Sequence, residues 1–208
     1  FKDGNHDAII AIGGGSAMDG GKLICLTANN DVPLRDFEFE LTPPVISKDN
    51  PFPKIITIPT TAGTGAETEI SAMVTYLKEG MKFCMWHPDV RPSLALLDPE
   101  LTIGLPANLT AWTGADALIH GIEGYCVPGF NPMCDGAALE GLSLISKSLN
   151  DLSNFSNLER SFKTIEDIFL ANTRHSISEL LASLLAPCTP VEATSPTAYN
   201  PFLVEDAF

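Results

Sequence analysis

Basic residues and long apolar runs are both scarce in this sequence. Twelve lysines and arginines stand against 26 aspartates and glutamates, which gives a formal net charge of −14. Most of such a surface would repel a polyanionic backbone, so we expect no nucleic acid partner. The apolar runs, at residues 8–12 and 94–97 for example, are far shorter than the roughly 20 residues that cross a bilayer. We therefore expect no membrane span.

Signals for secretion and for disulfide bonding are also lacking. Residues 1–7 have neither the basic start nor the apolar stretch of a secretory signal, so we expect a cytoplasmic protein. The five cysteines are widely spaced and form no C-x-x-C pair, which argues against a disulfide framework and a thiolate zinc site. We expect reduced, mostly buried thiols. His6 and His87 stand alone in expected loops, and we interpret both as surface residues.

Apolar residues make up 45% of the chain, which is enough for a sizeable core in one large or two small domains. Short apolar runs at residues 7–12, 55–58 and 94–97 alternate with small-residue loops and with a helix-compatible segment at 16–26. Strands that alternate with helices predict a parallel α/β layer.

From Pro106 onward apolar residues recur at helical spacing, which predicts a helical region. One expected helix begins after Pro132, and residues 162–185 could form a later one. The apolar faces of the first two expected helices are Ala115, Leu118, Ile119 and Ile122, and Ala138, Leu142, Ile145 and Leu149.

A run of glycines stands where the first expected strand becomes a helix. Gly13, Gly14, Gly15 and Ser16 could direct backbone N–H groups and the positive end of a helix dipole toward an anion such as a diphosphate. Ser16 could also cap the helix, with Asp19 completing a capping box. The alternative is a tight strand-to-helix connection that binds nothing.

A second loop of small residues, with Thr60, Thr61 and Thr64, follows the next expected strand. Parallel strands present their carboxyl ends to one crevice, where nucleotides usually bind. Two such loops at one edge of a sheet favour a nucleotide site over two unrelated turns.

Asp116 and His120 are four residues apart on an expected helix, which places both side chains on one face. A carboxylate and an imidazole suit divalent iron or zinc, whereas magnesium and calcium prefer oxygen ligands throughout. Glu123 lies near the same face and could orient one of these ligands. The alternative is an i,i+4 hydrogen bond with no metal nearby.

Three segments occur together and in order: GGGSAMD at 13–19, TTAGTGAETE at 60–69 and GADALIHGIEGY at 114–125, with RPSLALLDPELTIGLP between the last two. This combination resembles the iron-containing (group III) alcohol dehydrogenases over about residues 1–150. The resemblance implies a Rossmann-like dinucleotide-binding α/β domain and an all-helical metal-binding domain, a dehydroquinate synthase-like architecture. We assign residues 1–100 to the first domain and 101–208 to the second, and expect both to be incomplete relative to the family.

The resemblance also implies how NAD or NADP would be held. Residues 13–16 would hold the cofactor pyrophosphate, Asp19 would lie near the nicotinamide, and the three threonines of the second loop would contact the cofactor further along. Lys82, in the segment MKFCMWHP, matches a lysine that approaches the cofactor ribose. Its alternative role is that of a solvated surface lysine.

By the same resemblance, Asp116 and His120 are the first two ligands of a catalytic divalent metal, with Fe²⁺ preferred and Zn²⁺ as the alternative. The family's two further histidine ligands lie in G-x-x-H-A and P-H-G motifs, and neither motif stands clearly in this sequence. His175 is a candidate third ligand, with a polar helix face as its alternative. Two ligands alone would bind a metal weakly.

These features predict an oxidoreductase that moves a hydride reversibly between a primary alcohol and NAD(P), giving an aldehyde, with the metal as Lewis acid. Asp19, Asp116 and His120 are the expected catalytic residues, the substrate is a small alcohol or aldehyde, and a homodimer is expected by family analogy. Two alternatives stay open. One is a reductase of the same fold, such as a maleylacetate reductase, glycerol dehydrogenase or hydroxyacid transhydrogenase, and the other is an inactive nucleotide-binding or dimerising subunit.

Overall fold

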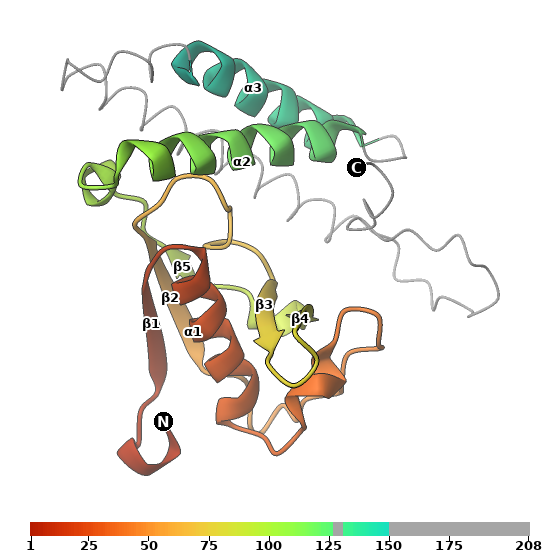
Figure 1. Ribbon diagram of the computed structural model, residues 1–208. Coiled ribbons are helices and arrows are strands. Elements are labelled where there is room, and N and C mark those ends of the chain that lie inside the picture. Colours follow the sequence, from red (N-terminus) through yellow and green to blue (C-terminus); the bar gives the residue numbers. More distant parts are fainter. Residues whose placement is uncertain (127–130, 150–208) are drawn as a thin grey trace.

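The computed structural model describes residues 1–126 and 131–149 (Figure 1). Its strands are β1 (Ala8–Gly13), β2 (Lys54–Pro59), β3 (Ser71–Tyr76), β4 (Met81–Trp86) and β5 (Leu94–Ala95). Its α-helices are α1 (Gly15–Ala28), α2 (Ala107–Cys126) and α3 (Pro132–Leu149). Short 3-10 helices are η1 (Lys2–Gly4), η2 (Leu34–Phe37), η3 (Pro88–Val90) and η4 (Pro99–Thr102).

The main sheet has the strand order β1-β2-β5, and both pairs are parallel. The register of the first pair runs from Ala8 opposite Lys54 to Gly13 opposite Pro59, so the two strands end side by side. The predicted parallel layer is confirmed. The run at 94–97 forms a strand only at Leu94–Ala95.

Helix α1 lies against one face of this sheet (Figure 1). Met18 of the helix packs in a buried cluster with Ala11, Ile55 and Ala66. A side chain at Gly21 would place its Cβ 2.8 Å from the Cβ of Ala11, so the helix can approach β1 this closely only because residue 21 is glycine. The predicted helix at 16–26 is confirmed and extends to Ala28.

The hairpin of β3 and β4 is an element that the sequence analysis did not predict. Its strands pair from Ser71 opposite Trp86 to Tyr76 opposite Met81. Gly80, at φ +68°, supplies the left-handed turn residue between them. Met85 of β4 packs with residues of α1 and η2 in a second buried cluster, so the hairpin packs against α1.

Helices α2 and α3 lie side by side above the sheet (Figure 1). The predicted face of α3 is confirmed, because Ala138 and Ile145 are buried. The predicted face of α2 is wrong, since Ile119 and Ile122 are exposed. Gly121 lets α3 come close, since a Cβ there would lie 2.9 Å from Leu142. The buried face consists of small residues instead: Thr110, Gly114, Ala117 and Gly121.

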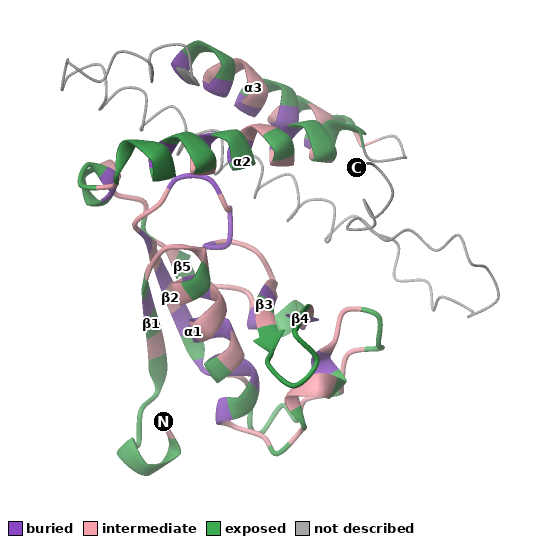
Figure 2. Ribbon diagram, viewed as in Figure 1, coloured by how far each residue is buried: buried purple, intermediate pink, exposed green. Residues whose placement is uncertain are grey.

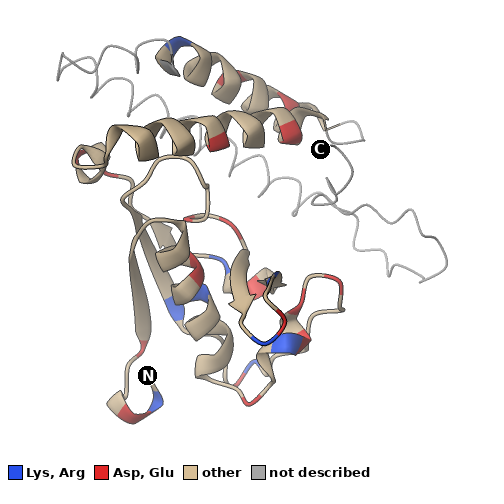
Figure 3. Cartoon of the chain, viewed as in Figure 1, with Lys and Arg blue, Asp and Glu red and all other residues tan. Residues whose placement is uncertain are grey.

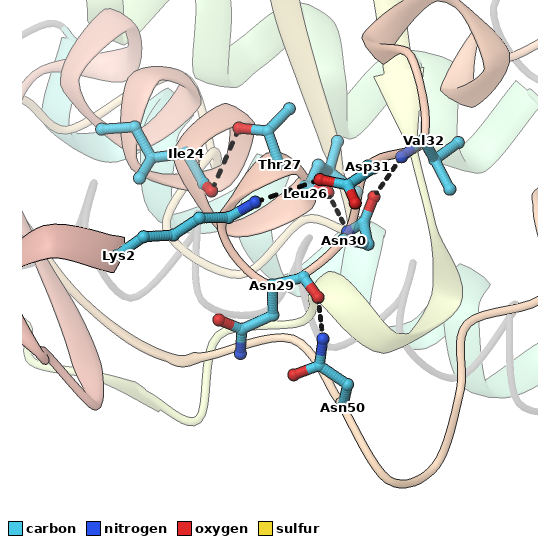
Figure 4. Close-up of polar contacts among 9 residues, drawn as sticks. All are labelled: Lys2, Ile24, Leu26, Thr27, Asn29, Asn30, Asp31, Val32 and Asn50. Carbon is cyan, nitrogen blue, oxygen red and sulfur yellow. Dashed lines mark hydrogen bonds and ion pairs between the residues drawn. The ribbon is translucent and has the colours of Figure 1, made fainter.

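Polar side chains close the C-terminal end of α1 (Figure 4). The Asn30 amide donates to the carbonyl of Leu26 at 2.6 Å, and its oxygen accepts the Val32 N–H at 3.0 Å. The amide of Asn50 donates to the carbonyl of Asn29. These contacts satisfy carbonyl groups that the end of a helix leaves open, and they fix where the chain leaves α1.

Four of the cysteines lie among the described residues, and all four are free thiols. Cys25 and Cys134 are buried, Cys84 is half-buried and Cys126 is exposed. Burial raises the pKa of the Cys25 thiol to about 12, so this group stays protonated. In the part of the chain described, no helix is both long and apolar enough to cross a membrane.

Candidate active site

The glycine turn joins β1 directly to the first turn of α1. Gly13 has φ +144°, a conformation that side chains rarely adopt, and a Cβ there would lie 2.7 Å from the Cβ of Ala17. The helix begins at Gly15 with Gly14 as its N-cap, and no side chain caps it. Ser16 is therefore a helical residue of the first turn, so the predicted serine cap is wrong. The uncapped N–H groups leave a helix N-terminus suited to an anion.

The second loop lies directly beside the glycine turn. The backbone N–H of Thr60 donates to the carbonyl of Gly13 at 2.8 Å. Side chains built at Gly14 and Gly15 would approach Thr61 to 3.3 Å and Thr64 to 3.1 Å. The prediction that both loops meet at one edge of the parallel sheet is confirmed. The threonines of the second loop lie beside the free N–H groups at the start of α1.

Helix α1 carries both acidic and basic residues (Figure 3), and one such pair, Asp19 and Lys22, faces the first strand of the hairpin. The Lys22 side chain is fully buried, and its ammonium donates to the carbonyl of Ser71 at 2.8 Å. The Asp19 carboxylate lies near the N–H of Met73. Asp19 and Lys22 thus both face backbone groups of β3, and the hydrogen bond from Lys22 ties the hairpin to α1.

Burial raises the pKa of the Asp19 carboxyl above its ordinary value. The positive charge of Lys22, the hydrogen bond from Met73 and the charge of Lys82 act in the opposite direction. Lys82 itself is exposed and lies on β4, opposite Thr75. The structure therefore brings the two residues that the sequence placed near a cofactor, Asp19 and Lys82, close enough for the charge of Lys82 to act on the Asp19 carboxyl.

The loop of residues 60–65 also touches α2 (Figure 2). Ala62 packs with Ala117 of α2 and Ile145 of α3 in a buried cluster. A Cβ at Gly63 would lie only 2.2 Å from the carbonyl oxygen of Thr113. One loop therefore contacts both the glycine turn and the two helices.

Asp116, His120 and Glu123 lie along α2, one turn apart from one another. The Oδ2 atom of Asp116 is 3.7 Å from Nε2 of His120, and the Oε2 atom of Glu123 is 3.9 Å from Nδ1. The imidazole is three-quarters buried, whereas both carboxylates are half-exposed. No lysine or arginine lies on this helix (Figure 3), so its charge favours a cation.

Sequence comparison shows which proteins share these features. The sequence profile for the iron-containing alcohol dehydrogenases matches residues 1–99, and the profile for the C-terminal part of the same family matches residues 110–176. The chain belongs to the iron-containing alcohol dehydrogenase family. The segments at 13–19, 60–69 and 114–125, on which the resemblance rests, all lie within the two matched ranges.

Individual relatives support the same assignment. An NAD-dependent methanol dehydrogenase from Bacillus methanolicus is 39% identical over 149 residues, which are 72% of this chain and 38% of that protein. A 4-hydroxybutyrate dehydrogenase from Cupriavidus necator is 41% identical over 144 residues, 68% of this chain and 37% of that one. This chain thus spans less than half the length of these two relatives.

Solved structures of the family share the fold. A sulfoacetaldehyde reductase from Bifidobacterium kashiwanohense in complex with NAD+ matches with a TM-score of 0.70 and 33% identity, covering 83% of this chain and 45% of that one. A 1,3-propanediol oxidoreductase matches with a TM-score of 0.72 and the same identity. The expected architecture, an α/β part followed by a helical part, is confirmed by these neighbours.

The geometry of the Asp116–His120 pair suits two ligands of one metal ion. Two ligand atoms that are each about 2.1 Å from a tetrahedral ion lie about 3.4 Å apart, close to the observed 3.7 Å. Glu123 faces the other ring nitrogen, which is how carboxylates commonly orient a metal-binding histidine. Within residues 1–126 and 131–149, no three histidine, cysteine or acidic side chains converge on one point. The candidate third ligand, His175, lies outside the described residues, as does the possible helix at 162–185.

Two residues near the site were missed by the sequence analysis. Lys22 lies on the apolar stripe of α1 with Met18 and Cys25, and a lysine on such a stripe signals a buried charge with a partner. Gly63 had no signal of its own, because its close contact is with a helix fifty residues later. His6 is exposed as predicted, but His87 is buried, so its assignment to the surface is wrong.

Proposed function

We propose that the protein transfers a hydride reversibly between a primary alcohol and NAD(P), giving an aldehyde. The observation that supports this most directly is the second loop, which joins the glycine turn on one side to the helix of Asp116 and His120 on the other. A dinucleotide on the glycine turn and a metal on α2 would then share one site. The relatives named for NAD favour NAD over NADP.

We assign the cofactor to the loops at the sheet edge. Residues 13–16 bind the pyrophosphate through backbone N–H groups at the start of α1. The threonines of the second loop donate hydroxyl hydrogen bonds further along, and Lys82 approaches the ribose. Asp19, which lies near the Met73 N–H, faces the nicotinamide end. These contacts orient the cofactor, and the cofactor itself supplies the redox chemistry.

We assign the metal to Asp116 and His120, with Fe²⁺ preferred over Zn²⁺. When bound, such an ion acts as a Lewis acid that lowers the pKa of the alcohol. Asp116 and His120 hold the ion, and Glu123 fixes the imidazole so that Nε2 faces Asp116. We also propose a division of the chain at residue 100 and a homodimer.

The test measures metal, cofactor and turnover separately in the full-length protein. His120→Ala and Asp116→Ala should each lose the iron that the wild type retains after desalting, while the Kd for NADH stays within about threefold because the cofactor loops are unchanged. His6→Ala, an exposed histidine, is the matched control and should keep its iron. Normal alcohol oxidation by Asp116→Ala would refute the metal assignment.

A further inference from the structure

The loop of residues 60–65 packs against two parts of the molecule at once. On one side its threonines contact the glycine turn, and the Thr60 N–H donates to the Gly13 carbonyl. On the other side Ala62 and Gly63 contact α2. Ala62, Gly63 and residues 65–67 are buried, so the loop fills the space between the sheet edge and the helices (Figure 2).

Gly63 makes the closest of these contacts. A Cβ there would lie 2.2 Å from the carbonyl oxygen and 2.6 Å from the Cβ of Thr113. The oxygen belongs to the backbone of α2, so no rotation of a side chain can make room for it. Gly63 does not have the positive φ of Gly13 or Gly65, so the backbone conformation does not require glycine here. Glycine is required at position 63 only because this residue lies so close to α2.

Thr113 lies about one turn before Asp116 on α2, on the side of the helix that carries the proposed metal ligands. His120 follows it by seven residues and Asp116 by three, so all three lie on one side of the helix. Ala117, which packs on Ala62, lies on the same side. A movement of α2 at Thr113 therefore moves the Asp116–His120 pair as well.

We propose that Gly63 is a positioning residue that sets the distance between the dinucleotide on the glycine turn and the Asp116–His120 pair on α2. The proposal rests on the function proposed above, since it assumes that hydride passes between these two places. A hydride moves only when the reacting atoms are about 3–3.5 Å apart, and a misplacement of about 1 Å costs about 100-fold in rate. An added methyl at residue 63 must push α2 away by a comparable distance.

The variant to make is Gly63→Ala in the full-length protein. We expect kcat to fall about 100-fold, while the Kd for NADH stays within about threefold because the glycine turn and the threonines are unchanged. Gly20→Ala is the matched control, because a Cβ at Gly20 meets nothing within 4 Å. It should leave both kcat and the Kd for NADH near wild type.

Trp112, the residue before Thr113, provides a readout that does not depend on turnover. The chain has two tryptophans, so in a Trp86→Phe background the energy transferred to bound NADH comes from Trp112 alone. Gly63→Ala should lower this transfer, because α2 moves away from the cofactor. If the wild type oxidises no alcohol, the proposed function fails, yet the transfer measurement still decides where α2 lies.

Two results would overturn the proposal. One is unchanged energy transfer and unchanged kcat in Gly63→Ala, and the other is a loss of NADH affinity as large as the loss of kcat. If Gly63→Ala does not fold, Ala62→Gly takes its place, since it removes the methyl that packs on Ala117 without adding an atom. Ala62→Gly should lower kcat about tenfold while NADH affinity is retained. An equal loss of kcat and of NADH affinity would contradict the proposal that this loop positions α2.

Discussion

At the scale of single residues, His87 shows why a lone histidine in a loop is hard to place from sequence. Its Nδ1 accepts the N–H of Asp89 at 3.0 Å, and its Nε2 lies 3.0 Å from the carbonyl of Pro44. Both bonds form when the neutral ring carries its proton on Nε2, a tautomer assigned from these partners. Phe37 and Phe52 pack edge-on to the ring. Two satisfied nitrogens and an aromatic pocket therefore make burial favourable.

Replacing His87 with alanine should lower the free energy of unfolding by about 2–4 kcal/mol. The change removes buried ring contacts and leaves the Pro44 carbonyl and the Asp89 N–H without their partner, and each such group costs about 1–3 kcal/mol. Urea unfolding at neutral pH measures the loss. His6→Ala should change stability by less than about 0.5 kcal/mol, since His6 is exposed. Equal losses in the two variants would contradict the structural role of His87.

Asp19 should make stability depend on pH in a defined direction. Its pKa is raised by burial, so between the ordinary aspartate pKa and the raised one the folded protein holds a proton that the unfolded chain has lost. The contribution of Asp19 to the free energy of unfolding is fully present at low pH and is lost as the pH rises through the raised pKa. We expect the stability of the wild type, relative to Asp19→Asn, to fall over that interval in urea unfolding at a series of pH values. A difference that rises with pH would contradict this assignment.

At the scale of elements, the pair on α1 should couple the helix to the hairpin. Lys22→Met removes a buried, charge-assisted hydrogen bond to the Ser71 carbonyl, which costs about 1.5–3 kcal/mol. In a double-mutant cycle with Asp19→Asn, the two changes should interact by at least about 0.5 kcal/mol, because each residue offsets the other's charge. Lys54→Met, at an exposed lysine, is the control. Strict additivity would mean that the two side chains act independently.

The same elements show how far the sequence could predict the fold. The strands at 7–12 and 55–58 and the helix at 16–26 carried clear apolar runs and glycine boundaries, and each formed where expected. The hairpin was missed because its strands mix exposed and half-buried residues, so little alternation marks them. The face of α2 was misassigned because hydrophobicity favours Ile119, whereas close packing against α3 selects small residues such as Gly121.

At the scale of the whole molecule, the candidate site depends on contacts between segments far apart in the chain. Motifs identified the residues at 13–19, 60–69 and 114–125, but no local pattern could show that residues 60–65 contact α2 as well as the glycine turn. Spacing alone did place Asp116 and His120 on one helical face, and they lie 3.7 Å apart. The rest of a metal site could not be predicted, since its ligands would come from other elements.

The net charge of the whole chain leads to a prediction about salt. A charge of −14 repels itself more strongly in the compact state than in the unfolded chain, which lowers stability. Raising the ionic strength from about 0.01 M to about 0.15 M shortens the screening length from about 30 Å to about 8 Å. Within residues 1–126 and 131–149, the attractive pairs that salt would weaken most are exposed ones, such as Lys2–Asp31 and Arg35–Glu79, and such pairs contribute little.

Potassium chloride should therefore raise the urea concentration at the midpoint of unfolding. The free energy of unfolding should rise by on the order of 1 kcal/mol, about as much as one exposed ion pair contributes. Chloride is preferable to sulfate, because sulfate stabilises proteins by exclusion from their surface and could also occupy the N-terminus of α1. Sodium chloride at the same ionic strength is the control and should give the same gain, because screening depends on ionic strength and not on which monovalent cation is present. A midpoint that falls with potassium chloride would mean that attractive ion pairs outweigh the repulsion expected from the excess of acidic residues.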